Sequence, residues 1–255
     1  MKNIIFLIGF IMVVFLQSCQ DKNLTEVVEV PLPTADEKLS IGSPQEVTAD
    51  EGSFQLQKLP YKYEALAPYI DPLTMETHYS KIYVAHLNAL NRAVENTPLE
   101  ELSIEELLTK IDLSDSKVRY NAGGYYNHNM FFDSMAPKTG GVPKDTLANT
   151  IKRDFGSFEN FKKQFADEAR TQFGSSWTWL VLDKSGKLVI TSTQLQDNPL
   201  MKNALIKGKP ILVIDLWEHA YFLSYQQKRK NYIEAFFNVV NWPKVQDRFE
   251  NALVK

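Results

Sequence analysis

The most informative stretch of the sequence, residues 208–221, reads Gly-Lys-Pro-Ile-Leu-Val-Ile-Asp-Leu-Trp-Glu-His-Ala-Tyr. The apolar, β-branched run from Pro210 to Leu216 predicts a buried strand. Asp215 and His219 stand at the end of this strand, where both side chains can turn inward toward a ligand. A carboxylate and an imidazole in that position are candidate metal ligands.

The chain has only four histidines, so any imidazole-based site must use this small set. His78 lies in a helix predicted over 75–94, with its N-cap at Thr74. His128 lies in a helix predicted over 116–135, which we expect the two glycines at 123–124 to interrupt. A lone histidine in an apolar stretch is usually a core residue, but three imidazoles and one carboxylate suit a transition metal. Spacing alone leaves both interpretations open.

The remaining pattern predicts an α+β fold. Helical spacing dominates the first half of the globular part, and the character changes after the loop at 140–143. Two β-rich runs follow, joined by the hairpin-turn signature at 183–186. Helices followed by a short antiparallel sheet wrapped in helices are typical of the α+β class. The other predicted elements are helices over 100–111, over 149–172 with a break at 155–157, and from 232, and strands over 177–182 and 188–192.

Strings around the candidate ligands extend the pattern over most of the chain. They are Leu59-Pro60-Tyr61, Met75-Glu76, Asn121-Ala122-Gly123-Gly124, Asn127-His128, 173–180, 196–200, 215–221 and 238–242. From about Leu59 to the C-terminus the chain resembles the iron/manganese superoxide dismutases. This resemblance implies an N-terminal helical hairpin (55–140), followed by a C-terminal domain (141–255) whose three-stranded antiparallel sheet is surrounded by helices.

The resemblance also implies an activity and a metal site. Members of the family convert superoxide to dioxygen and hydrogen peroxide, by cycling one Mn or Fe ion between its 3+ and 2+ states. Carried over position by position, the metal ligands are His78, His128, Asp215 and His219. Solvent is expected to supply a fifth ligand.

Other matched positions concern the choice of metal and the cavity. Gln196 matches the glutamine that hydrogen-bonds the metal-bound solvent, and Gly124 fills the place where another version of the family carries that glutamine. This arrangement favours Mn without excluding Fe or an enzyme that accepts both, since raw affinity does not decide loading. Trp177, Trp179 and Trp217 are expected to line the cavity. Without the resemblance, Gln196 would be interpreted as a loop capping residue and the tryptophans as core residues.

Glu218 matches a glutamate that reaches the ligand His219 of a partner subunit, which implies a homodimer with two-fold symmetry. The alternative is a solvated surface charge.

The chain departs from the family at the entrance to the site. Aligned without gaps, His86 takes the place of the gateway tyrosine and Ile82 that of the gateway histidine. At about 100° per residue, both lie on the helix face of His78, whereas Tyr83 is rotated by roughly 140°. Phe222 replaces the tyrosine that bonds the gateway histidine across the dimer, so Ile82 and Phe222 form a matched apolar substitution.

His86 raises two further expectations. It lies about 12 Å along the helix from His78, so both cannot bind one metal. An ordinary imidazole pKa near 6.5 predicts a pH dependence of activity around neutrality; alternatively, His86 is only a polar wall residue. The altered gateway also leaves two other functions open: a non-dismutase metal-binding relative, and a different redox activity such as peroxide-dependent chemistry.

Composition excludes some function classes. With 28 basic against 31 acidic residues, the net charge of −3 argues against a nucleic-acid partner. The single cysteine excludes an intramolecular disulfide and a cysteine-based zinc site.

The N-terminus predicts export and anchoring. Residues 1–18 combine an early lysine with an apolar run of signal-peptide length, and Leu16-Gln17-Ser18-Cys19 resembles a bacterial lipobox. We expect lipidation of Cys19, a flexible polar tether over 19–54, and an extracytoplasmic, membrane-anchored lipoprotein on the periplasmic or surface side.

Overall fold

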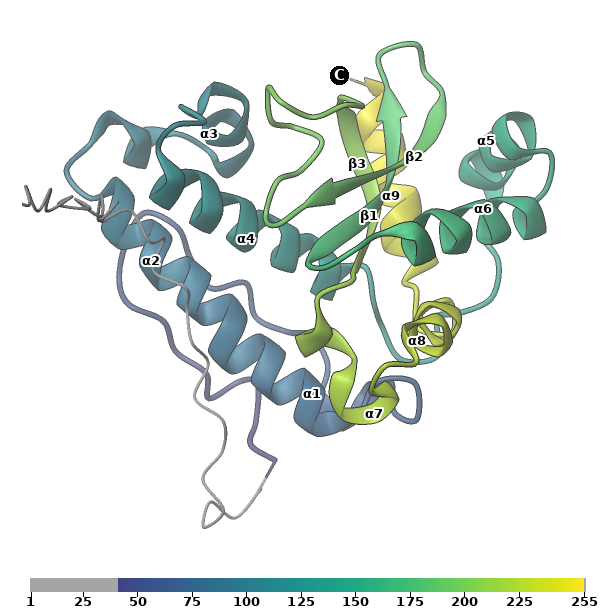
Figure 1. Cartoon of the computed structure of the whole chain (residues 1–255), viewed down its shortest axis with the longest axis horizontal. Helices are drawn as coiled ribbons and strands as arrows, with labels where there is room; N and C mark the ends of the chain where they lie inside the picture. The colour runs from purple at the N-terminus through teal and green to yellow at the C-terminus, as the bar shows by residue number, and fades with distance from the viewer. Residues whose placement is uncertain (1–40, 255) are drawn as a thin grey trace, which may run out of the picture.

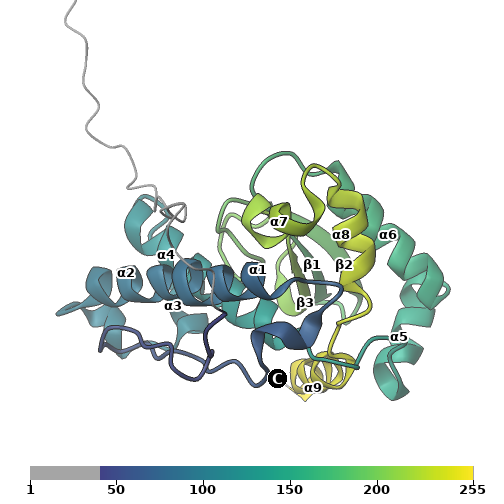
Figure 2. The ribbon, with the colours of Figure 1, turned by 90° about the horizontal axis from the view of Figure 1, so that it is seen from below.

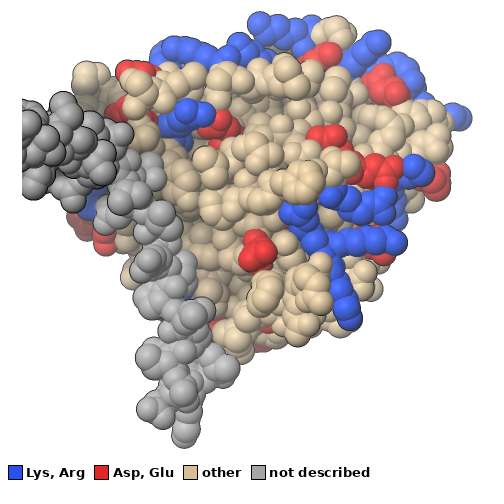
Figure 3. All heavy atoms as spheres, viewed as in Figure 1, with Lys and Arg blue, Asp and Glu red and all other residues tan. Residues whose placement is uncertain are grey.

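The computed structural model describes residues 41–254 (Figure 1). The predicted signal peptide, Cys19 and the tether as far as residue 40 lie outside the described residues. Within the described part of the chain, no helix combines the length and the apolar character needed to cross a bilayer. On the face seen in Figure 3, acidic and basic side chains are interspersed around a broad uncharged area.

The first long helical stretch carries the first candidate ligand. Helix α1, Pro72–Thr77, begins at Asp71, whose side chain accepts a hydrogen bond from the backbone N–H of Thr74. Asp71 is thus the N-cap in place of the expected Thr74, because Pro72 fits the first helical position. A π-helical turn, His78–Tyr83, follows, and helix α2, Val84–Val94, continues the same axis.

The second arm of the hairpin is α4, Ser116–Asp133, which packs against α2 and follows the short helix α3, Ile104–Lys110. The expected interruption at Gly123 and Gly124 does not occur. Both glycines instead allow close approach: a Cβ on Gly123 would lie 2.0 Å from the carbonyl oxygen of Gln196, and a Cβ on Gly124 2.4 Å from Nδ1 of His86. Tertiary contacts therefore outweigh the helix cost of about 1 kcal/mol per glycine.

The C-terminal domain holds the sheet. Strands β1, Ser176–Asp183, and β2, Leu188–Gln194, form the expected hairpin, and β3, Gly208–Asp215, pairs with the other edge of β1 in the order β2-β1-β3, all antiparallel. Helix α6 contacts β1 and β2, while α4 and α9 contact β3. The α+β prediction is confirmed. The remaining helices are α5, Asp145–Phe155, α6, Phe158–Thr171, α7, Phe222–Tyr225, α8, Arg229–Phe236, and α9, Trp242–Val254.

Residues 41–54 belong to the folded unit, which differs from the expected flexible tether ending at 54. They run beside α1 and α2 (Figure 2). The backbone N–H of Asp50 donates to Asn88, 2.9 Å, and Phe54 exchanges two backbone hydrogen bonds of 3.0 Å with the side chain of Asn91. The helix side chains satisfy the backbone of this segment, and Phe54 is buried, so its polar composition does not keep it free.

Candidate metal centre

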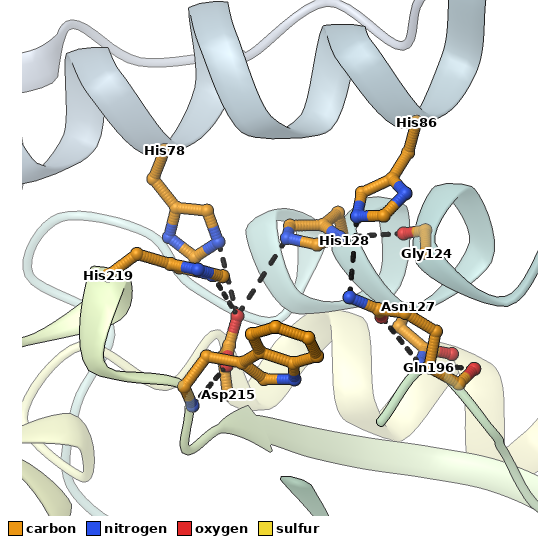
Figure 4. Close-up of polar contacts among 9 residues, drawn as sticks. His78, His86, Gly124, Asn127, His128, Gln196, Asp215 and His219 are labelled. Carbon is orange, nitrogen blue, oxygen red and sulfur yellow. Dashed lines mark hydrogen bonds and ion pairs between the residues drawn. The ribbon is translucent and has the colours of Figure 1, made fainter. Parts of the chain in front are cut away.

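Three separate parts of the chain bring the four predicted ligands together (Figure 4). His78 comes from the π-helical turn, His128 from α4, Asp215 from the end of β3, and His219 from the 3₁₀ turn after it. One ligand atom from each residue lies within 4.8 Å of the others. We call these four residues the metal cluster.

In the metal cluster, the Nε2 atoms of three histidines surround one carboxylate oxygen. Oδ2 of Asp215 lies 3.1 Å from Nε2 of His219, 3.2 Å from Nε2 of His78 and 3.8 Å from Nε2 of His128. The Nε2 atoms of His78 and His128 are buried and have no hydrogen-bond partner among the described residues. Buried polar atoms normally have partners, so this arrangement fits a cation held by three nitrogens and one oxygen.

The protonation states also fit a cation. Burial, reinforced by the neighbouring imidazole of His219, lowers the pKa of His78 to about 4, and burial holds the pKa of His128 well below its usual range. Burial alone would raise the pKa of Asp215, but His219 and His78 outweigh it, so the carboxyl titrates below its ordinary value. At neutral pH, His78 and His128 are therefore neutral and Asp215 is charged, which are the forms that bind metals.

Backbone groups orient the ligands. Nδ1 of His128 donates to the carbonyl oxygen of Gly124, 2.7 Å, which leaves the lone pair on Nε2 facing the cluster. Oδ1 of Asp215 accepts from the backbone N–H of Trp217, 2.8 Å, and this turns Oδ2 inward.

The tryptophans differ in their distance from the site. The ring centroid of Trp177 is 5.1 Å from that of His128, and Trp217 stacks on His219 at 5.6 Å. Trp179 contacts Trp177, and its Nε1 donates to Thr193. The structure therefore places Trp179 behind the wall of the site, since its indole is turned toward the neighbouring strand.

At the gateway, the structure places His86 beside Gln196: the Nε2 atoms of the two side chains are 3.3 Å apart. Tyr83 points elsewhere, with its hydroxyl bonded to Asn129 and to the backbone of Gln57. Figure 4 shows His78 and His86 projecting from one helical stretch toward the same region.

The ordinary imidazole pKa on which the expected pH dependence of activity rests does not apply to His86. Its side chain is 3% exposed, and burial lowers its pKa to about 4 despite the hydrogen bond to Asn121. The imidazole is therefore neutral throughout the neutral pH range.

The three remaining predicted residues differ in their exposure, since Ile82 is buried whereas Phe222 and Glu218 are exposed. Ile82 is 7% exposed, whereas Phe222 is 50% exposed. Glu218 is exposed. The segment that holds His219 thus exposes one carboxylate, that of Glu218, and one aromatic side chain, that of Phe222.

Sequence reasoning assigned no role to several residues that contact the gateway. Asn121 contacts His86, Asn127 contacts Gln196, and Asn198 contacts Asn127. All three lie in the sequence strings that carry the family resemblance, and this position was the one feature of the sequence that could have indicated a role. Tyr120, whose ring centroid is 5.3 Å from that of His86, lies outside those strings and gave none.

Comparison with known proteins agrees with this geometry. Residues 53–136 match the family profile described as iron/manganese superoxide dismutases, alpha-hairpin domain, and residues 143–248 match its C-terminal domain. The chain is 44% identical to the superoxide dismutase [Mn] of Acinetobacter baylyi over 205 residues, 79% of this chain and 90% of that protein. It is 45% identical to superoxide dismutase [Mn] 1 of Leptolyngbya boryana over 203 residues, 78% of this chain and 81% of that protein.

Proposed function

The chain belongs to the iron/manganese superoxide dismutases and converts superoxide to dioxygen and hydrogen peroxide; from this premise we propose that it does so as a homodimer anchored to a bacterial membrane, outside the cytoplasm. The observation that carries the activity is the metal cluster, in which three imidazoles and one carboxylate meet within 4.8 Å. With relatives named as dismutases, this cluster supports dismutation over the two alternatives that the altered gateway raised.

When bound, one Mn or Fe ion supplies a 3+/2+ couple that oxidises one superoxide and reduces another. We assign His78, His128, Asp215 and His219 as its ligands. Asp215 contributes the negative charge that stabilises the higher oxidation state, and the neutral imidazoles contribute lone pairs. The metal is Mn in our proposal, because both relatives carry that name and Gln196 comes from the C-terminal domain.

The surrounding residues hold these groups in place and keep bulk water out. Trp177 packs against the ring of His128, and Trp217 stacks on the ring of His219. Gln196 adds a neutral amide side chain, and this residue is only 2% exposed. The overall reaction consumes two superoxide anions and two protons, and gives one dioxygen and one hydrogen peroxide. A buried neutral surround lets the protein tune the reduction potential of the ion.

The proposed dimer forms around Glu218 and His219. Phe222 and Leu223 are 50% and 56% exposed beside them, and a second copy would cover both apolar side chains. In a two-fold dimer, Glu218 of each subunit would meet His219 of the other, and Phe222 would meet Ile82. Sedimentation of the wild type and of Glu218→Ala tests this: the variant should dissociate at concentrations where the wild type is dimeric, and a monomeric wild type contradicts the proposal.

The proposed location rests on Cys19 and the apolar run before it. Acyl chains on Cys19 would hold the enzyme near superoxide formed outside the cytoplasm, an anion that crosses membranes poorly. Labelling with a fatty-acid analogue should mark the wild type but not Cys19→Ser, and only the wild type should remain in the membrane fraction. Equal labelling of both proteins would contradict the anchor.

The activity is tested directly on the chain beginning at Gln20, loaded separately with Mn and with Fe and assayed with its metal content quantified. We expect dismutation with Mn. Full metal occupancy with no dismutation in either the Mn-loaded or the Fe-loaded protein would contradict the function, and activity with Fe alone would contradict the proposed metal.

A further inference from the structure

We propose that Asn121 is a positioning residue that fixes the tautomer of His86 and, through it, the orientation of the Gln196 amide. The inference builds on the dismutase function above, because Gln196 contacts His86, whose ring centroid lies 5.3 Å from that of the ligand His128. It concerns five side chains that form one chain of hydrogen bonds, which we call the amide network. Its members are Asn121, His86, Gln196, Asn127 and Asn198.

The backbone fixes one end of the amide network. Nδ2 of Asn121 lies 3.0 Å from the carbonyl oxygen of Lys117, one turn earlier in α4. A carbonyl oxygen can only accept, so the NH₂ group of Asn121 must face it. This leaves Oδ1 of Asn121 toward Nδ1 of His86, at 3.2 Å.

The tautomer of His86 follows from this arrangement. Oδ1 of Asn121 can only accept, so Nδ1 of His86 must carry the hydrogen. Because the buried imidazole is neutral, its Nε2 keeps a lone pair. That lone pair faces the side chain of Gln196, and the group that can donate to it is the amide NH₂, 3.3 Å away.

The other end of the network leads to the same orientation independently. Oδ1 of Asn198 accepts from the backbone N–H of Leu200, 3.2 Å, so its NH₂ group donates to Oδ1 of Asn127, 3.1 Å. The NH₂ group of Asn127 then donates to the backbone carbonyl oxygen of Gln196, 3.1 Å, and lies 3.4 Å from Oε1 of the same residue. Oε1 of Gln196 thus faces Asn127, and its NH₂ group faces His86.

The position of the imidazole ring is also fixed. A Cβ on residue 124 would lie 2.4 Å from Nδ1 of His86, so the ring fits only over a glycine. The opposite tautomer in this place would set N–H against NH₂ at Gln196 and lone pair against lone pair at Asn121. Flipping the amides to avoid these clashes would break the bonds to the backbone at both ends.

The chemical consequence distinguishes this gateway from a tyrosine. A hydroxyl can donate and accept, whereas His86 in the Nδ1–H tautomer only accepts from Gln196. It therefore holds the amide by a lone pair and donates no proton to it. All hydrogen bonds of the amide network then run in one direction, from Asn198 to the carbonyl oxygen of Lys117.

Nitrogen NMR tests the tautomer without relying on activity. The full chain would be labelled with ¹⁵N at its four histidines, loaded with diamagnetic Zn²⁺, and examined by two-bond ¹⁵N–¹H correlation. His86 is assigned by the signals that His86→Leu loses. We expect a protonated Nδ1 and an unprotonated Nε2 in the wild type.

Three variants test whether Asn121 sets the tautomer of His86. Asn121→Leu removes the acceptor and should shift the His86 signals toward the Nε2–H tautomer, while Asn121→Asp keeps an acceptor and should retain a protonated Nδ1. Lys117→Ala is the matched control, since it keeps the backbone carbonyl, and should leave the spectrum unchanged.

An Nε2–H tautomer in the wild type, or an unchanged tautomer in Asn121→Leu, overturns the proposal. Even if Asn121→Leu does not fold, the wild-type spectrum shows whether Nδ1 of His86 carries the hydrogen. Absence of dismutation in the Mn- and Fe-loaded wild type would contradict the enzyme function and leave the tautomer result standing, so the two failures are distinguishable.

Discussion

The metal cluster and the amide network lie side by side, yet their polar atoms are satisfied in opposite ways. In the metal cluster, buried Nε2 atoms of His78 and His128 have no hydrogen-bond partner among the described residues. In the amide network, His86 and Gln196 each have partners within the protein. The first region is incomplete without a cation, whereas the second is complete in itself. Ligands and gateway residues should therefore fail in different ways when they are changed.

The largest expected effect is the loss of a ligand. His128→Ala removes one of the four donors and should abolish stable metal binding, with activity falling more than about 100-fold, since even groups that only support ligands contribute 10–100-fold. Metal content by mass spectrometry and dismutation by the same preparation measure both. His86→Leu is the matched control in the neighbouring region, and should retain wild-type metal content. Loss of metal in both variants would abolish the distinction between the two regions.

The glycine pair tests how tightly the amide network is packed. A Cβ on Gly123 meets a backbone oxygen at 2.0 Å, and backbone cannot easily move. Overpacking costs about 1–3 kcal/mol, which exceeds the gain of about 1 kcal/mol from replacing glycine by alanine in a helix. Gly123→Ala should therefore lower the free energy of unfolding, measured by urea denaturation.

Gly124→Ala tests the same packing against a single side chain, because the three atoms nearest to its Cβ all belong to the ring of His86. It should destabilise the wild type but stabilise the His86→Ala background by about 1 kcal/mol, where only the helix propensity remains. A change of the same sign in both backgrounds would show that the ring does not fill this space.

A smaller effect is expected from the gateway itself. His86→Leu keeps the metal and most of the volume, but removes the acceptor of the Gln196 amide. A net hydrogen bond is worth about 1 kcal/mol, so activity per bound metal should fall about 3- to 10-fold. Steady-state rates normalised to metal content measure this. Activity per metal equal to that of the wild type would show that the amide network does not depend on His86.

Much of the metal cluster could be predicted from the sequence, and the reason is local. Asp215 and His219 lie at and just after the end of a strand that its β-branched residues predict, and His78 and His128 lie in stretches that the sequence predicts as helices. The pattern thus indicated candidate donors, and the resemblance assigned them as the ligands of one metal. Their approach to within 4.8 Å is a long-range result that periodicity alone does not contain.

The amide network could not be predicted in the same way. The direction of its hydrogen bonds depends on two backbone groups, the carbonyl of Lys117 and the N–H of Leu200, whose positions only the fold sets. The continuity of α4 through Gly123 and Gly124 likewise follows from contacts with distant residues. Helix propensity is a weak preference that tertiary packing overrides.

The smallest expected effect concerns Asp71, a carboxylate that is not a ligand but connects two segments that carry ligands. Asp71 caps α1, which leads to His78, and its side chain also accepts a hydrogen bond from Ser224 in α7, shortly after His219. Asp71→Asn keeps an oxygen that can cap the helix, because Asn caps about as well as Asp, but it removes the charge that both links use. It should therefore lower the free energy of unfolding by less than the value of about 1 kcal/mol that is usual for loss of an N-cap. Ser224→Ala, which keeps the cap and removes only the link to α7, should cost less.

The difference in free energy of unfolding between the wild type and Asp71→Asn should depend on pH. Burial alone would raise the pKa of Asp71, but hydrogen bonds from Ser224 and Thr74 outweigh it and hold the pKa below 3.8. A carboxyl whose pKa is lowered in the folded state stabilises the protein fully above its unfolded pKa, and the stabilisation is lost as the pH falls through the folded pKa. The gap between wild type and Asp71→Asn should therefore be constant at neutral pH and close below about pH 4. A gap that persists undiminished at pH 3 would mean that the Asp71 charge does not support the link between the helices on either side of the metal cluster.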